Sequence, residues 1–164
     1  MIFISHSHVD HLGGMNEQKT RTFSISQGPV TLPDIPVYAP VALSGSKWNP
    51  GFEAKVITVP TVLKQGIASI GPIHRALFLI GLTLEHSLAI NVEGKGIVLI
   101  IGCGHQTIER IIERAQAIFD EPIYGIIEGL HYPVNGGRIM VGPINVQFIV
   151  VSITRGGGTS ARRM

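Results

Sequence analysis

Residues 5–14 read Ser-His-Ser-His-Val-Asp-His-Leu-Gly-Gly, and no other stretch of the chain says as much about its fold. Three of the seven histidines and one of the three aspartates lie between His6 and His11. Imidazole and carboxylate groups are the usual protein ligands of zinc and related first-row metals. An ordinary core or surface has little reason to place four such groups within six positions, so the pattern predicts a metal site.

The spacing separates these four groups into two sets. Residues 1–5 are mainly apolar and include the β-branched Ile2 and Ile4, which predicts a buried strand that ends at His6. An extended backbone points residues i and i+2 the same way, so His6 and His8 can hold one metal together. Asp10 and His11 follow after the chain has begun to turn. They can therefore hold a second metal or a metal-bound water.

Two further histidines follow later predicted strands. The segment 102–105, Gly-Cys-Gly-His, lies where a buried strand meets a helix, and the segment 128–131, Glu-Gly-Leu-His, ends the next strand. Rigid strand ends followed by loops are favoured positions for metal-binding groups. We therefore expect His105 and His131 to complete the site, with Glu128 as a polar neighbour.

The remaining pattern alternates strands with one helix. Strands are predicted at 35–39, 54–59, 75–82, 84–92, 96–101, 123–127 and 146–153, with a polar connection over 15–34, a helical turn over 42–46, a loop over 65–72, a hairpin turn over 93–96, and a turn with a short strand over 136–142. Isoleucines at helical spacing between charged residues predict an amphipathic helix over 106–119. This order indicates one α/β domain over 1–154, followed by a flexible tail over 155–164.

Composition narrows the functional classes. At 164 residues the chain can bury roughly 70% of its unfolded surface in a single domain. The net charge of +2 does not by itself predict nucleic-acid binding, and we expect the basic residues of the tail to be solvated. The single cysteine, Cys103, allows no intramolecular disulfide, which suits a reducing cytoplasm. Apolar runs such as 76–84 are shorter than the ~20 residues of a membrane helix, so we expect a soluble cytoplasmic protein.

These motifs resemble a known superfamily. The pattern His-x-His-x-Asp-His, followed by Gly-Gly and preceded by an apolar strand, is similar to the signature of the metallo-β-lactamase superfamily. The resemblance implies a four-layer α/β/β/α sandwich and a zinc-dependent hydrolase. Residues 85–131 further resemble the 7,8-dihydropterin-6-yl-methyl-4-(β-D-ribofuranosyl)aminobenzene-5'-phosphate synthase-like branch. In that branch a Gly-Cys-Ser-His motif precedes the helix and a Gly-Gly-Phe-His motif follows the next strand.

Two departures from that pattern are evident. Superfamily members carry two or more strands before the first motif, whereas here it begins at residue 6. We expect either an N-terminally truncated form of the sandwich, or a sheet whose exposed part is covered by another element or by a partner subunit, such as a second copy of the chain. The branch also carries a C-terminal His-Cys-Thr-Gly motif, where this chain has Ser-Ile-Thr-Arg at 152–155.

The resemblance implies one or two divalent metal ions, zinc first, with iron and manganese as alternatives. The expected ligands are His6, His8, Asp10, His11, His105 and His131. The bridging ligand stays open between Cys103, Glu85 and none. His74 and His86 are expected to serve structure rather than metal binding.

Three functions fit this site. The first is a hydrolase in which a metal lowers the pKa of a bound water toward ~7 and Asp10 orients that water or takes its proton. Its substrate would be a small ester or phosphoester, and a phosphorylated molecule would suit the branch. The second is a pterin-ribosyl-aminobenzene-phosphate synthase-like transferase. The third is a non-catalytic or subunit-dependent metal-binding protein.

Overall fold

The computed structural model describes residues 1–30, 33–77, 81–129, 140–141 and 144–145. The predicted ligand His131, the predicted strand over 146–153 and the predicted tail over 155–164 lie outside the described residues. The helices are α1 (Val9–Leu12), α2 (Met15–Thr20) and α3 (Ile108–Gln116). The strands are β1 (Ile2–Phe3), β2 (Thr22–Phe23), β3 (Val37–Ala39), β4 (Ser44–Gly45), β5 (Ala54–Val56), β6 (Thr61–Lys64), β7 (Ile67–Ser69), β8 (Ile73–Leu77), β9 (Gly81–Glu85), β10 (Leu88–Val92), β11 (Gly96–Ile101), β12 (Ile123–Glu128), β13 (Met140–Val141) and β14 (Ile144–Asn145).

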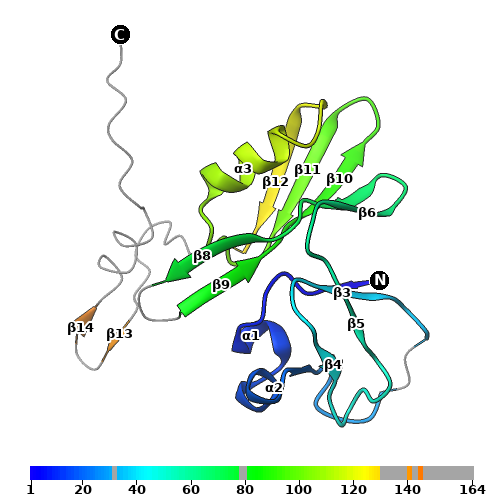
Figure 1. Ribbon diagram of the computed structural model, residues 1–164, viewed down its shortest axis with the longest axis vertical. Helices are drawn as coiled ribbons and strands as arrows, with labels where there is room; N and C mark the ends of the chain where they lie inside the picture. The colour runs from blue at the N-terminus through cyan, green and yellow to red at the C-terminus, as the bar shows by residue number, and fades with distance from the viewer. Residues whose placement is uncertain (31–32, 78–80, 130–139, 142–143, 146–164) are drawn as a thin grey trace.

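The largest sheet has the order β12-β11-β10-β7-β6 and carries α3 against one face (Figure 1). β10 and β11 form an antiparallel hairpin, while β11 and β12 are parallel and are joined through α3. Ile97, Leu99 and Ile101 alternate along β11 as buried residues, and they pack with Ile111 and Ala115 of α3. Since burying one large aliphatic side chain stabilises by about 1.5–3 kcal/mol, this core fixes where the loop after β11 emerges.

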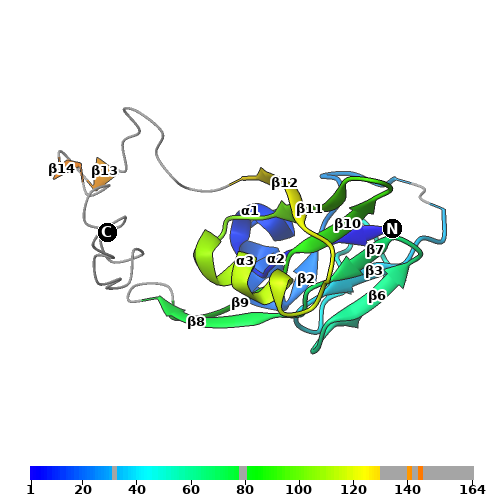
Figure 2. The ribbon, with the colours of Figure 1, turned by 90° about the horizontal axis from the view of Figure 1, so that it is seen from above.

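A second core lies beneath a smaller parallel sheet of order β1-β3-β5. It joins Val37 and Ala39 of β3 to Leu12 of α1 and Phe23 of β2. Figure 1 shows α1 and α2 beside this part of the chain, and Figure 2 gives the same arrangement from above. Ile4 and Leu12, which flank the histidine motif, belong to this second core, while His8 and His11 contact His105 and Cys103 in the loop after β11.

Several sequence predictions are confirmed. The structure is mixed α/β, β11 has the bounds 96–101, and the hairpin turn over 93–96 joins β10 to β11. The helix is confirmed but shorter than 106–119. It begins only after Thr107, whose backbone φ of 71° is not helical, and it ends at Gln116.

Other predictions were wrong because pairing with distant strands overrode the local pattern. The helical turn over 42–46 is the strand β4, which pairs in parallel with β2. The loop over 65–72 contains β7, which pairs with both β6 and β10. The single strand over 84–92 is two strands, since Glu85 pairs with Ile73 whereas Leu88 pairs with Ser69 and Ile100. The polar connection over 15–34 includes α2 and β2.

None of the helices in the described residues is both long and apolar enough to span a membrane. The β8–β9 hairpin, in contrast to the two packed cores, projects beyond the end of the five-stranded sheet (Figures 1 and 2). Its residues Glu85 and Arg75 nevertheless form hydrogen bonds with the backbone of the loop that follows β11.

The turn between β10 and β11 provides a stability prediction. Gly94 has a φ of +70°, and a Cβ built there meets nothing within 4 Å, so Gly94→Ala adds backbone strain without a clash. We expect it to lower the free energy of unfolding by about 1–2 kcal/mol in urea denaturation. Gly28→Ala is the control, since its site is equally open and its φ is not left-handed. Equal stability of the two variants would contradict this account.

Candidate metal centre

Residues 5–14 lead from the end of β1 through the short helix α1 to Gly13 and Gly14. The backbone N–H of Ile4 donates to the Tyr38 carbonyl at 2.9 Å, which continues the β1–β3 pairing up to the motif. His8 then precedes α1 in an extended conformation, with φ −83° and ψ 162°. Gly13 ends this one-turn helix with φ 98°, and a Cβ there would lie 2.9 Å from that of Ser24. Glycine is therefore required at this turn.

Three histidines form the first group. His6, His8 and His105 each offer a nitrogen, and these nitrogens all lie within 4.8 Å of one another. Nδ1 of His8 is 3.0 Å from Nε2 of His105, although 97 residues separate them in sequence. Two nitrogens that share a tetrahedral zinc lie about 3.3 Å apart, so the spacing suits a shared ion. His6 is fully buried.

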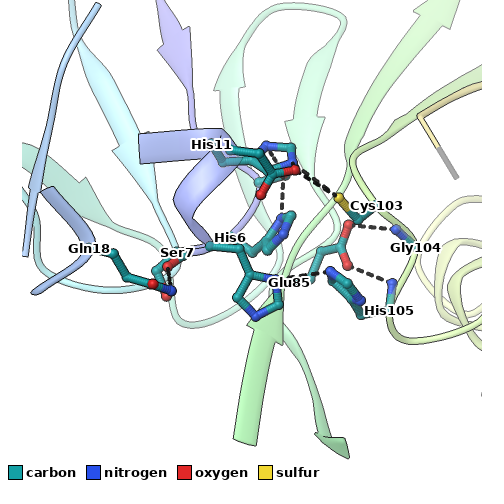
Figure 3. Close-up of polar contacts among 11 residues, drawn as sticks. His6, Ser7, His11, Gln18, Glu85, Cys103, Gly104 and His105 are labelled. Carbon is teal, nitrogen blue, oxygen red and sulfur yellow. Dashed lines mark hydrogen bonds and ion pairs between the residues drawn. The ribbon is translucent and has the colours of Figure 1, made fainter. Parts of the chain in front are cut away.

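A second group combines nitrogen, sulfur and carboxylate. Nε2 of His11 lies 3.1 Å from Sγ of Cys103, and together with His6 these atoms form a second set within 4.8 Å. Asp10 Oδ2 is 3.3 Å from His11 Nε2 and 3.7 Å from Cys103 Sγ. Figure 3 shows His6, His11, Cys103 and His105 side by side. Half of the Asp10 side chain is exposed, so this group opens toward solvent.

The Cys103 thiol is strongly affected by this environment. Burial, followed by the negative charges of Asp10 and Glu85, raises the pKa of Cys103 to about 12. The thiol is thus protonated at neutral pH in the metal-free protein. Because a metal ligand must be a thiolate, ligation by Cys103 would require a cation that displaces this proton.

Glu85, which the sequence left open as a bridging ligand, forms hydrogen bonds with backbone N–H groups in the structure. The carboxylate is buried, and its two oxygens accept the backbone N–H groups of Gly104 at 2.9 Å and His105 at 2.8 Å. It does not belong to either metal-binding group among the described residues. Of the two bridging candidates named from the sequence, Cys103 belongs to a group of candidate ligand atoms with His6 and His11, whereas Glu85 is hydrogen-bonded to the backbone of the Cys103–His105 loop.

The other two histidines lie outside both groups. His74 is exposed on β8. His86 is buried and bonds to Ser69 and to the Ile4 carbonyl. The sequence interpretation missed the contributions of Glu85, Arg75 and Gln106 to the loop at 102–107. They follow ordinary strand and helix patterns, and nothing in their spacing marks them.

No family model and no curated protein matches this chain. Among solved structures it is similar to Tm1679, a metal-dependent hydrolase of the β-lactamase superfamily, with 19% sequence identity and a TM-score of 0.41. The similarity covers 51% of this chain and 38% of that protein. This chain therefore spans less than half of the length of Tm1679.

Proposed function

We propose that this chain is a metal-dependent hydrolase of the metallo-β-lactamase superfamily, built on the four-layer sandwich of that superfamily. The observation that carries the proposal is the convergence of the residues 6–11 with His105 and Cys103, which follow them by more than 90 positions. Chance burial of a histidine-rich loop would not bring the distant imidazole and thiol to its nitrogens.

The donor atoms suit two adjacent ions. His6 contributes to both groups, but its Nδ1 faces the Ser5 hydroxyl at 3.0 Å, which leaves Nε2 as its ligand atom. His6, His8 and His105 would then hold one ion. His11 and Asp10 would hold the second, with Cys103 or His131 completing it. A mixture of imidazole, thiolate and carboxylate is typical of zinc sites, and iron or manganese are the alternatives.

A bound divalent ion would supply Lewis acidity and would lower the pKa of a water molecule at the site. The protein residues would then divide the remaining tasks. Asp10 is the half-exposed carboxylate of the cluster, so it can orient the attacking water and accept its proton. The buried His6 ring contacts the Ser5 hydroxyl and the imidazoles of His8 and His11, which would orient it toward the ion. The substrate proposed for this arrangement is a small ester or phosphoester.

The test is metal-dependent hydrolysis of chromogenic esters and phosphoesters. Chelator-treated protein should be inactive, and zinc, iron or manganese should restore activity. Asp10→Asn should lower kcat/KM about 100-fold or more, because the amide cannot accept the proton. Asp34→Asn, a change outside the cluster, serves as the control. Turnover that survives chelation, or that Asp10→Asn leaves unchanged, would contradict the proposed mechanism.

A further inference from the structure

The β8–β9 hairpin forms several hydrogen bonds with the loop that carries Cys103 and His105. From β9, the Glu85 carboxylate accepts the N–H groups of Gly104 and His105. From β8, Nη1 of Arg75 donates to the His105 carbonyl at 2.9 Å. The hairpin thus holds the His105 backbone at both its N–H and its C=O, as Figure 3 shows for the Glu85 side.

A side chain of the loop also donates hydrogen bonds to the hairpin backbone. Gln106 is fully buried, and its side-chain Nε2 donates to the Thr83 carbonyl at 3.1 Å and to the Ile73 carbonyl. These acceptors lie on the two paired strands, so one amide links the loop to both. Thr107 follows with a φ of 71°, which L residues rarely adopt. The hairpin contacts hold the loop in a conformation that it would not keep alone.

The carboxylate is also packed against the start of the motif. A Cβ built on Gly102 would lie 2.3 Å from Oγ of Ser5 and 2.9 Å from Oε1 of Glu85. Ser5 directly precedes His6, and its Oγ lies 3.0 Å from Nδ1 of that ring. The loop and the motif therefore meet at Gly102 without space between them, so a shift of the loop would displace ligands on both sides.

We propose that Glu85 is a positioning residue of the metal centre, assisted by Arg75. By fixing two successive backbone N–H groups, Glu85 aims the Cys103 side chain at His11 and the His105 side chain at His8. The β8–β9 hairpin would then support the centre from outside, since none of its described residues belongs to either candidate metal-binding group. This inference rests on the proposed function, because it needs the centre to bind a metal.

Cobalt(II) is the probe, since its absorption reports both geometry and thiolate ligation. Chelator-treated wild type, Glu85→Gln and Glu93→Gln are titrated with cobalt(II) in competition with a chelator, and the unfolding free energy of each metal-free protein is measured in urea. Glu85→Gln keeps the size of the side chain but turns an amide NH₂ toward a backbone donor. Glu93→Gln removes the same charge at an exposed turn position.

We expect Glu85→Gln to bind cobalt(II) about 10- to 100-fold more weakly and to lose thiolate-to-cobalt absorption, while Glu93→Gln matches wild type. A purely structural role would lower the unfolding free energy but leave the spectrum of the folded, loaded protein unchanged. Equal affinity and an equal spectrum would overturn the inference and leave the proposed function standing. If wild type itself binds no cobalt(II), both fail.

A buried substitution can prevent folding, so Arg75→Gln is the second variant. Arg75 is part-buried, and the variant replaces its long, charged donor to the His105 carbonyl by a shorter neutral amide while Glu85 itself is unchanged. We expect a smaller loss, about 10-fold in cobalt(II) affinity, with altered absorption. If Glu85→Gln does not fold, wild-type affinity and spectrum in Arg75→Gln would overturn the inference.

Discussion

Replacing His8 and His11 together by Ala should remove most of the metal that the purified protein carries. Each histidine belongs to a different group, so the double change takes one nitrogen from each of the two proposed ions. Wild type should contain about one to two zinc, iron or manganese ions per chain, and the double variant close to none. Elemental analysis by mass spectrometry after gel filtration measures both.

The control for this experiment is His74→Ala, which removes an exposed imidazole from β8 and leaves both groups intact. Its metal content should equal that of wild type. Circular dichroism of each variant verifies that folding is retained, so that a loss of metal is not a loss of structure. Metal content that the double substitution leaves unchanged would rule out the ligand assignment.

Acid should destabilise the protein through His86, a histidine outside the candidate centre. Its Nε2 lies 3.0 Å from the Ile4 carbonyl, which can only accept, so Nε2 carries the proton. Its Nδ1 then accepts from the Ser69 hydroxyl at 2.9 Å, and Phe3 stacks on the ring at 4.1 Å. Both nitrogens of the neutral ring therefore have a hydrogen-bond partner. Desolvation by burial, partly opposed by the Ile4 bond, lowers the pKa of His86 from 6.5 to about 4.

The direction of the effect follows from that lowered pKa. Between pH 6.5 and about 4 the unfolded chain binds a proton at His86, whereas the folded chain does not. The stability that the neutral His86 contributes is therefore fully present above pH 6.5. It is lost as the pH falls toward 4, at up to about 1.4 kcal/mol per pH unit. Urea denaturation of chelator-treated protein over this range measures the slope.

His86→Gln should flatten that slope, because glutamine does not titrate. It should also lower the unfolding free energy at pH 7 by about 1–3 kcal/mol, since buried hydrogen bonds are disturbed. His74→Ala, at an exposed position, should keep the wild-type slope. A slope in His86→Gln that equals that of wild type would show that another group causes the acid sensitivity.

The local elements were the most predictable part of this fold. The hairpin of β10 and β11 and the helix α3 follow from a turn sequence and from isoleucines at helical spacing, and both depend on neighbours in the sequence. The strands β4 and β7 were missed because each is two or three residues long and is stabilised by strands distant in sequence. Short segments carry too little pattern to outweigh that tertiary pairing.

In the candidate site too, local spacing was predictable, whereas contacts between distant residues were not. Spacing alone predicted that His6 lies with His8 and apart from Asp10 and His11, whereas the structure places His6 in a group with His8 and also in a group with His11. Spacing could not choose between Cys103 and Glu85 as a further ligand, since both follow strands and both have metal-binding chemistry. The structure distinguishes them by direction: the Cys103 sulfur faces His11, while both Glu85 oxygens face backbone N–H groups.

The sequence by itself therefore determined which chemical groups are available and where the chain turns, because residue type and local periodicity act over a few positions. Only the tertiary structure decided which of these groups meet. Contacts between separate sheets bring together Glu85 and Gly104, about 20 positions apart, and His11 and Cys103, about 90 positions apart. Such contacts depend on the burial of two whole cores, and no short stretch of sequence encodes that energy.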